Sequence, residues 1–288
     1  MKISFWTSGR EGSGVTSNLA CISIALSMEY SYKSVLIENH YQKNKLGSML
    51  KYQWVNYTEK EEDYGFKHIG IDYIMQRFAN KRHHNKFAQD LINSDYKPAQ
   101  IIEEASLEIL DHTLYYIPVN YQFNQQTFDY NLYYNIKEIM DATENFADFT
   151  FIDTSNQNSL SSKIILDEAD LVVVNLVQNS TMIQYFFDNY KSIFDKCVFL
   201  ISNYNKKSSL NLNKISKIHS INKLMIAAIP YNIEYQEAVS RGTVVEFIAR
   251  NYKCSRKNPN YSFIRSVKKA TAMIMMAASN ISRKEDSL

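Results

Sequence analysis

Three of the seven glycines in this 288-residue chain fall within six positions, at Gly9, Gly12 and Gly14. They follow a short strand-like run at residues 3–6 and precede residues 15–30, whose apolar side chains recur at helical spacing. Glycine allows backbone conformations in which successive N–H groups curl around an anion, and the N-terminus of a following helix also favours negative charge. The sequence therefore predicts a strand, a glycine-rich loop and a helix that together bind phosphate.

Residues 9–16 have the sequence GREGSGVT, which matches the P-loop pattern GxxxxGK[ST] at every defined position except one. The exception is the lysine, which is Val15 in this chain. Taken alone, the stretch could also be an ordinary glycine-rich turn between a strand and a helix. The order of the later segments favours the phosphate-binding interpretation.

Strand-like and helix-like segments alternate along most of the chain. We expect a polar insertion of loop and helix at about 41–110 and an amphipathic helix at about 260–281 that covers the sheet. Alternation of this kind predicts an α/β fold, with a doubly wound, mainly parallel sheet, helices on both faces, and a single domain over residues 1–288. The segments predicted between these limits are strands at 34–38, 113–119, 148–153, 171–177, 197–203 and 224–230, and helices at 69–78, 128–140, 181–194 and 210–218.

Polar residues stand at the carboxyl ends of the predicted strands, which is where sheets of this kind bind ligands. Glu38 ends the second strand and Asp153 ends a central one. Asn203 and Pro230 stand at the ends of the last two strands. Each alone could be a turn residue, a helix cap or a strand terminator. Together with the glycine loop, they predict one binding site at this edge of the sheet.

Composition restricts the class of protein. With 45% apolar and 22% charged residues, the chain can bury a full core, and disorder is excluded. Its three cysteines, Cys21, Cys197 and Cys254, fit neither a disulfide framework nor a zinc site, which favours a reducing compartment such as the cytoplasm. No apolar run reaches the roughly 20 residues of a membrane-spanning helix, and no signal peptide is expected.

Charge is distributed unevenly along the chain. The net charge is +2, yet residues 200–288 carry 15 Lys and Arg against 5 Asp and Glu, and residues 1–199 carry 17 against 25. A basic C-terminal third could face nucleic acid or a membrane surface, or it could complement the acidic remainder of the same fold. Both interpretations stay open at this stage.

The glycine loop and the strand ends resemble the ParA/MinD family of P-loop ATPases. In the deviant Walker A motif of that family, KGGxGKTT, an extra lysine precedes the glycines, and the motif lies over residues 10–17 with Arg10 at the extra lysine. Residues 37–42 are similar to the second-strand motif IDxDxQ, with Glu38 and His40 at its two aspartates. Residues 153–154 are similar to the Walker B segment and its aspartate, and residues 202–203 to the adenine-side strand end. Residues 229–232 together with 237–239 are similar to the family's IPxD motif followed by EA. The resemblance covers residues 1–250.

The resemblance implies ATP and Mg²⁺ as ligands. Backbone amides of the glycine loop would hold the phosphates, Thr16 would bind Mg²⁺ directly, and Asp153 would hold the ion through water. Arg10 would reach the nucleotide of the partner in a homodimer. The residues expected to act in catalysis are Arg10, Glu38 and His40, and those expected to bind the nucleotide are Gly9, Arg10, Gly12, Ser13, Gly14, Val15, Thr16, Ser17, Asn203, Pro230 and Tyr231.

Two departures from the family pattern predict slow or absent hydrolysis. Val15 removes the ammonium group that would neutralise phosphate charge, and His40 stands where an aspartate would help to place the attacking water. His40 could orient water as a neutral imidazole, but we favour a solvated loop histidine.

The degraded loop, together with a long segment around residues 70–72 and the run LYYIP at residues 114–118, makes the chain most similar to atypical TadZ-type localisation factors of pilus machinery. The implied function is a nucleotide-ordered dimeric scaffold for pilus or secretion assembly, in the cytoplasm or peripheral at the inner membrane face. One alternative is an active partition-type ATPase on DNA or membrane, with basic residues at 250–257 on DNA or the last helix on lipid. The other is a scaffold that binds no nucleotide.

Overall fold

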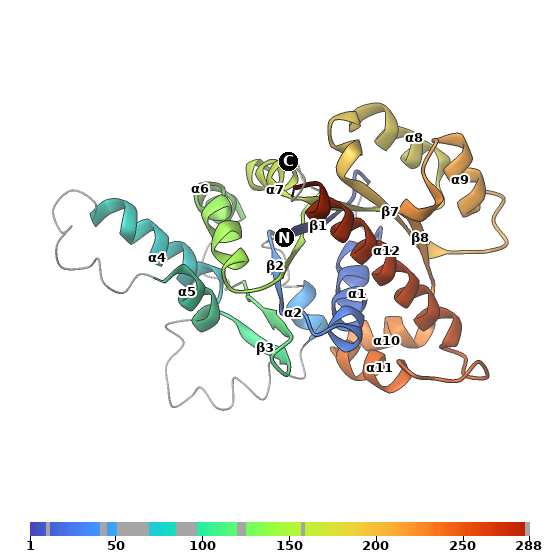
Figure 1. The fold of residues 1–288 in the computed structure, drawn as a ribbon, viewed down its shortest axis with the longest axis horizontal. Helices are drawn as coiled ribbons and strands as arrows, with labels where there is room; N and C mark the ends of the chain where they lie inside the picture. Colours follow the sequence, from blue (N-terminus) through green and yellow to red (C-terminus); the bar gives the residue numbers. More distant parts are fainter. Residues whose placement is uncertain are drawn as a thin grey trace.

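The protein is built around one eight-stranded sheet (Figure 1). This computed structural model describes residues 1–9, 12–40, 45–50, 69–84, 97–119, 125–156 and 159–285. Along the sheet the strand order is β3-β4-β2-β5-β1-β6-β7-β8, and every neighbouring pair is parallel except β3 with β4. The predicted mainly parallel α/β fold is confirmed. The strands are β1 (Lys2–Trp6), β2 (Ser34–Glu38), β3 (Leu107–Leu110), β4 (Leu114–Tyr116), β5 (Phe149–Asp153), β6 (Leu171–Leu176), β7 (Cys197–Tyr204) and β8 (Ile226–Pro230).

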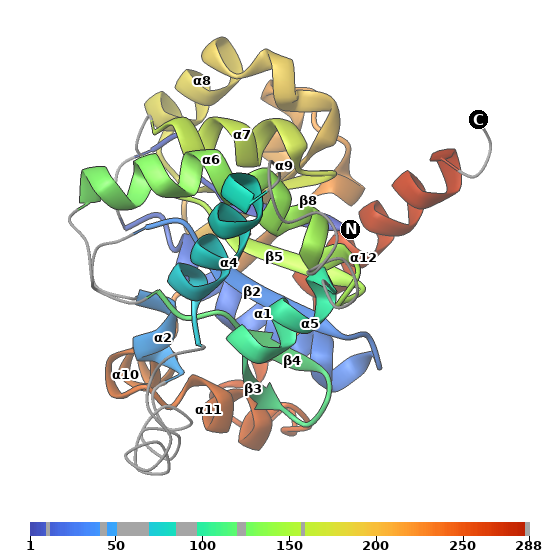
Figure 2. The same cartoon turned by 90° about the vertical axis from the view of Figure 1, so that its left-hand side faces the viewer.

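Helices cover both faces of this sheet (Figure 2). One face packs against α1 (Val15–Glu29), α2 (Lys45–Met49), α10 (Ile233–Arg241), α11 (Val244–Asn251) and α12 (Tyr261–Glu285). The other packs against α4 (Ile71–His84), α5 (Pro98–Ala105), α6 (Gln125–Glu144), α7 (Leu160–Glu168), α8 (Ser180–Asn189) and α9 (Leu212–Ile218). Two short 3₁₀ helices, Lys191–Lys196 and Lys223–Met225, precede β7 and β8.

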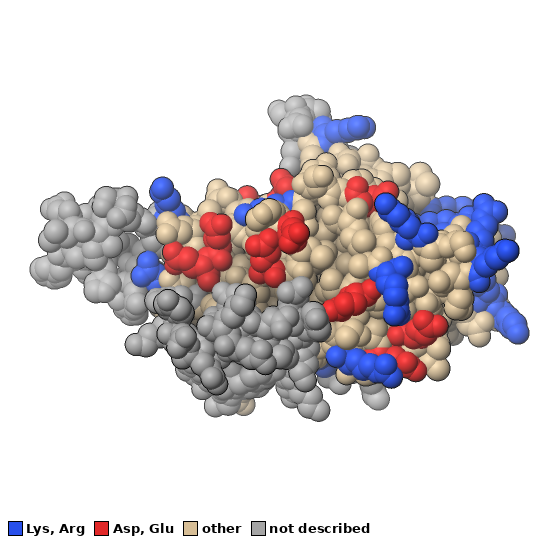
Figure 3. Space-filling model, turned by 90° about the horizontal axis from the view of Figure 1, so that it is seen from below, with Lys and Arg blue, Asp and Glu red and all other residues tan. Residues whose placement is uncertain are grey.

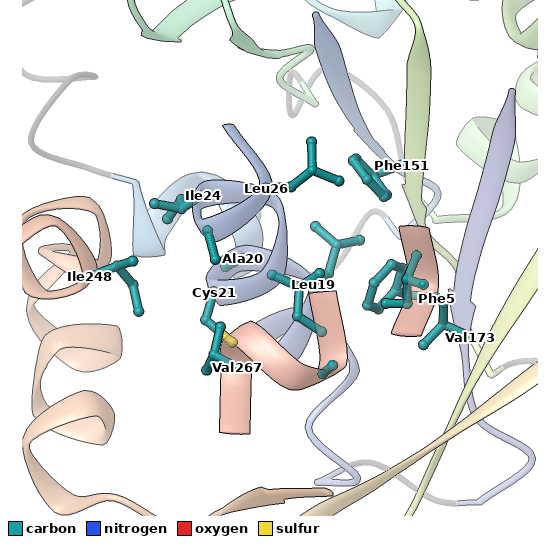
Figure 4. Close-up of a cluster of buried hydrophobic side chains, with 14 of the residues drawn as sticks. Phe5, Leu19, Ala20, Cys21, Ile24, Leu26, Phe151, Val173, Ile248 and Val267 are labelled. Carbon is teal, nitrogen blue, oxygen red and sulfur yellow. The ribbon is translucent and has the colours of Figure 1, made fainter. Parts of the chain in front are cut away.

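The central strands are apolar on both sides because each faces a helical layer. In β1, Phe5 packs with α1 and α12, whereas Trp6 points to the layer that contains α8. Figure 4 shows α1 side chains such as Leu19 and Cys21 lying between the strands and the helices α11 and α12. Packing on both faces therefore holds the sheet in place. The polar residues at the carboxyl ends of its strands consequently have well-defined positions.

Several predicted boundaries shift in the structure. The helix expected at 69–78 begins at Ile71, because Gly70 has a positive φ of 90° and donates its N–H to the Ala105 carbonyl. The helix expected at 181–194 ends at Asn189 and continues as a 3₁₀ turn. The strand expected at 113–119 is only Leu114–Tyr116.

The predicted insertion at 41–110 is described only in part. Residues 41–44, 51–68 and 85–96 lie outside the described residues. The remainder contributes α2, α4, α5 and β3, and β3 is the antiparallel edge strand beside β4. Sequence periodicity did not predict β3, because a four-residue strand with one buried face carries little pattern.

The C-terminal helix α12 packs its apolar face on α1 and β8, where Val267, Ala270 and Ile274 are buried. None of the helices in the described parts of the chain is long and apolar enough to cross a membrane.

Candidate functional site

The glycine loop leaves β1 and enters α1 through left-handed backbone. Gly12 has a φ of 93° and Gly14 a φ of 76°, a region that favours glycine. A Cβ on Gly14 would also lie 3.3 Å from the Cβ and the Oγ of Ser202 in β7. Gly14 is thus required twice, for its backbone conformation and for its close approach to β7. Arg10 lies outside the described residues.

The N-terminus of α1 opens onto a cavity of about 340 Å³. Gly14 is the residue before the first helical position, and no side chain of the described loop caps the helix there. The first backbone N–H groups of a helix have no partner within the helix, so at this end they face the cavity. Such an N-terminus is suited to an anion.

The cavity brings together most of the residues predicted from sequence. Those on its wall are Gly12, Ser13, Gly14, Val15, Thr16, Ser17, His40, Asp153, Asn203, Pro230 and Tyr231. Two predicted residues do not line it: Glu38 lies beneath, only 1% exposed, and Gly9 lies beside it, where its carbonyl accepts a 2.6 Å hydrogen bond from Asn156 Nδ2. Thr154, Ser202 and Val239, which lie in the segments similar to the family motifs, also line the cavity. Sequence reasoning missed Thr7, Asn18, Lys45, Met49, Ser155, Asn156, Tyr235, Gln236 and Phe263.

At the floor of the cavity, His40 meets Asp153. Glu38 and Asp153 are register partners at the ends of the adjacent strands β2 and β5. His40 Nε2 lies 3.0 Å from Asp153 Oδ2, and the His40 side chain is 18% exposed. The favoured expectation of a solvated loop histidine is therefore wrong, because pairing of β2 with β5 carries His40, the second residue after β2, into the site.

Asn39 accounts for the orientation of the His40 side chain. Its Oδ1 accepts a 2.6 Å hydrogen bond from the Ser155 N–H, and its Nδ2 donates to the hydroxyls of Ser161 and Ser162 in α7. Successive side chains of an extended chain point to opposite sides. With Asn39 anchored toward α7, Glu38 and His40 share the other side, next to Asp153.

Two buried carboxyl groups lie together here. Burial raises the pKa of Glu38 to about 8, the charge of Asp153 adds to this, and the hydrogen bond from Tyr116 opposes it. The Tyr116 hydroxyl donates to Glu38 Oε1 at 2.5 Å, and the Leu46 N–H donates to Oε2 at 3.4 Å. Burial also raises the pKa of Asp153, against the effects of His40, the Thr16 hydroxyl and Lys45. Glu38 is therefore largely protonated at neutral pH.

Lys45 brings a cation to the same cavity. It is the first residue of α2, it lines the cavity, and its charge lowers the pKa of Asp153. Val15 supplies no charge at the position where P-loops carry lysine. No motif in the sequence points to Lys45, because its place in the site depends on how α2 packs against α1 and α10.

A hydrogen-bond network ties α1 to the strands beside it. Asn18 Nδ2 donates to Asn175 Oδ1 at 2.9 Å and to Ser202 Oγ at 2.8 Å. Asn203 follows with a positive φ of 50°, and Tyr231 stands 60% exposed at the mouth of the cavity. The glycine loop, the strand ends and the residues at the mouth thus form one continuous wall of the cavity.

Comparisons with known proteins place the fold. The sequence matches no family model and no curated protein. The structure is similar to the cell division ATPase MinD of Pyrococcus furiosus, with a TM-score of 0.66 at 13% identity over 96% of this chain and 98% of that one. It is also similar to MinD of Pyrococcus horikoshii complexed with Mg-ADP, with a TM-score of 0.66 at 14% identity over 97% and 98% of the chains. A ParA family ATPase of Chlorobium tepidum gives 0.65 at 12% identity over 94% and 98%.

These likenesses define the class of fold: an α/β P-loop fold of the kind found in MinD and ParA ATPases. At 12–14% identity they show the fold alone.

Proposed function

We propose that the protein binds ATP with a divalent cation at the glycine loop. The observation that carries this proposal is the junction of left-handed Gly12 and Gly14 with an uncapped α1, described above, directly over the buried carboxylate of Asp153. Backbone amides of residues 12–16 would hold the phosphates. Polar side chains of Ser13, Thr16 and Asn18 lie on the cavity wall at this loop.

The residues at the floor fit a cation. Asp153 is fully buried, and neither of its carboxylate oxygens has a hydrogen-bond partner among the described residues. Buried polar atoms without partners are rare in folded proteins and point to a missing ligand. Thr16, whose hydroxyl faces this carboxyl group, would hold Mg²⁺ together with Asp153. When bound, the ion would neutralise part of the phosphate charge.

Lys45 would replace the P-loop lysine from another element. Its ammonium group already acts on Asp153 electrostatically across the cavity floor. A nucleotide on the loop would place its terminal phosphates near the same carboxylate, within reach of this cation. The side of the cavity formed by Asn203, Pro230 and Tyr231 would receive the base and sugar.

Hydrolysis would be slow or absent. His40 faces Asp153 at the place where the related pattern has an aspartate, and an imidazole held by a carboxylate is a different group for positioning water. Arg10, as the residue that would reach a partner's nucleotide, and Glu38, beneath the floor, remain catalytic proposals.

The biological role that this supports is a nucleotide-ordered homodimer. ATP would act as a ligand that orders the dimer, and the dimer would position an assembly such as a pilus or secretion apparatus, in the manner of TadZ-like proteins. A cytoplasmic site of action, with or without peripheral membrane contact, belongs to the same proposal. The match of nearly the whole chain to a cell division ATPase supports a role in cellular positioning.

Calorimetric titration of Mg·ATP into the protein tests the proposal. We expect saturable binding at a single site per chain and phosphate release well below ordinary ATPase rates. Asp153→Asn should weaken Mg·ATP binding about 10-fold or more, because it removes a charged cation ligand. Asp188→Asn, at an exposed position of α8, is the matched control and should bind as the wild type does. No heat and no thermal stabilisation at millimolar Mg·ATP would favour the scaffold that binds no nucleotide.

A partition-type function on DNA is supported by a separate observation. Lys and Arg gather at one end of the molecule in Figure 3, the end that holds α9 and the loops around α12 in Figure 1. Exposed lysines of this region are Lys206, Lys207, Lys214, Lys217 and Lys223. Binding of random duplex DNA that weakens steeply with salt, together with fast ATP turnover, would favour this function.

A further inference from the structure

Three side chains at the cavity floor offer ligand atoms to one point. Glu38, His40 and Asp153 each contribute one oxygen or nitrogen, and these atoms all lie within 4.8 Å of one another. They come from the ends of the paired strands β2 and β5, so the backbone holds them in place. Tyr116 fixes the Glu38 carboxyl group through its hydroxyl, and Asn39 anchors the chain between Glu38 and His40.

A second observation points to a ligand at this place. The Asp153 side chain is wholly buried, and neither of its oxygens has an aligned hydrogen-bond partner among the described residues, although the Thr16 hydroxyl acts on the carboxyl group. His40 Nε2 is also buried and also lacks a hydrogen-bond partner among the described residues. It lies 3.0 Å from Asp153 Oδ2, but the two atoms are not aligned as a hydrogen bond. Leaving three such atoms unsatisfied is costly, and a cation between them would satisfy all three.

The spacing suits a first-row divalent ion. Donors at about 2.0–2.2 Å from Zn²⁺ in a tetrahedral site are roughly 3.3–3.6 Å apart. The His40 and Asp153 atoms, at 3.0 Å, are already close to that separation. The Glu38 oxygen lies within 4.8 Å of both, and to join them the carboxyl group would have to shift from its present hydrogen bonds with Tyr116 and the Leu46 N–H.

The chemistry of the donors sets the preference among ions. Mg²⁺ favours an all-oxygen shell, whereas imidazole suits Zn²⁺ and neighbouring transition metals. One imidazole with two carboxylates is thus a ligand set for a transition metal, and binding of the ion would release the proton that Glu38 holds at neutral pH. The floor opens toward Thr16 and the glycine loop, which leaves one coordination position for water or a phosphate oxygen.

We propose that Glu38, His40 and Asp153 form a binding site for a divalent transition-metal ion of the Zn²⁺ class, with one open position toward the glycine loop. The site requires no nucleotide, and its occupation would replace the Mg²⁺ preference of an ordinary P-loop. This metal-site proposal goes beyond nucleotide binding and does not depend on whether the protein binds ATP.

Competition with a chromophoric chelator for Zn²⁺, without nucleotide, tests the site. We expect one tight equivalent in the wild type and a loss of at least about 10-fold in affinity for His40→Asn, since changes even to outer-shell groups cost 10- to 100-fold. The control is His112→Asn, which removes a histidine that is 90% exposed and paired with Glu108. A second control replaces the adjacent His83 and His84 with Asn. Equal affinity in His40→Asn, or loss in either control instead, would overturn the proposal.

Spectroscopy on the wild type keeps the test independent of folding defects in the variants. X-ray absorption of the Zn²⁺-loaded protein should show one imidazole nitrogen among oxygen ligands. A shell with sulfur, or with oxygen alone, would overturn the assignment. His40→Asp should keep binding Mn²⁺ while its preference for Zn²⁺ over Mn²⁺ falls about 10-fold or more, and an unchanged preference would contradict a nitrogen ligand.

Discussion

At the scale of single residues, Val15 and Lys45 form a pair that no motif connects. The loop has no ammonium group at Val15, and the fold presents the ammonium group of Lys45 from α2. A charge in a phosphate site acts through its position in space, so its place along the chain is free to change.

A charge exchange between these two residues tests this interpretation. Lys45→Met should weaken Mg·ATP binding about 10- to 100-fold, the effect of one charge-assisted contact, and adding Val15→Lys should restore most of it. Lys191→Met, an exposed lysine of the 3₁₀ turn before β7, serves as the control in the same titration. Wild-type affinity in Lys45→Met would show that the ammonium group does not contact the phosphates.

The buried Glu38 makes stability depend on pH. Its pKa is about 8 in the folded protein and near 4.5 when unfolded, so between these values the folded state holds a proton that the unfolded state releases. The contribution is complete below pH 4.5 and is lost as pH rises through about 8, with a slope of up to about 1.4 kcal/mol per pH unit.

Urea unfolding from pH 5 to pH 8.5 measures this effect. The free energy of unfolding of the wild type should fall with pH more steeply than that of Glu38→Gln. Glu246→Gln, on an exposed position of α11, should keep the wild-type slope. Parallel curves for the wild type and Glu38→Gln would mean that Glu38 does not hold its proton.

At the scale of elements, the site is made where three elements change direction: β1 into α1, β2 into the segment after it, and β5 into α7. Gly14 makes the first turn possible through its φ and through the lack of a Cβ next to Ser202. Asn39 makes the second, since its amide holds the end of β2 to Ser155 and to α7. A helix pattern alone locates α1, but these contacts decide where its N-terminus points.

Gly14→Ala tests the loop as an element. The change should destabilise the protein by about 1–2 kcal/mol, the cost of a left-handed conformation for a residue with a Cβ, and should also weaken Mg·ATP binding. Gly242→Ala is matched in backbone, with a φ of 74° at the end of α10, and Gly242 does not line the cavity. Chemical denaturation should show similar losses in both variants, while only Gly14→Ala should lose affinity. Equal affinities would contradict a ligand on this loop.

At the scale of the whole molecule, long-range packing decides the strand order of the sheet, which the apolar pattern of the sequence does not specify. The alternating apolar runs predicted a parallel sheet with two helical layers, because strands buried on both faces must be apolar on both sides. The strand order, with β1 between β5 and β6, and the antiparallel edge strand β3 were not predictable from those runs. Strand order depends on which face of the sheet each connecting helix covers. The same apolar periodicity along the chain is compatible with several strand orders.

For the site, the sequence by itself determined the glycine loop, Thr16, Asp153 and the strand ends, because their function follows from local backbone geometry and from the rule that parallel strands end at one edge. Only the tertiary structure decided that His40 meets Asp153, that Lys45 reaches the cavity, and that Glu38 is buried beneath it. The physical reason is that burial and electrostatic contact depend on distances between segments far apart in the chain, which no local pattern encodes.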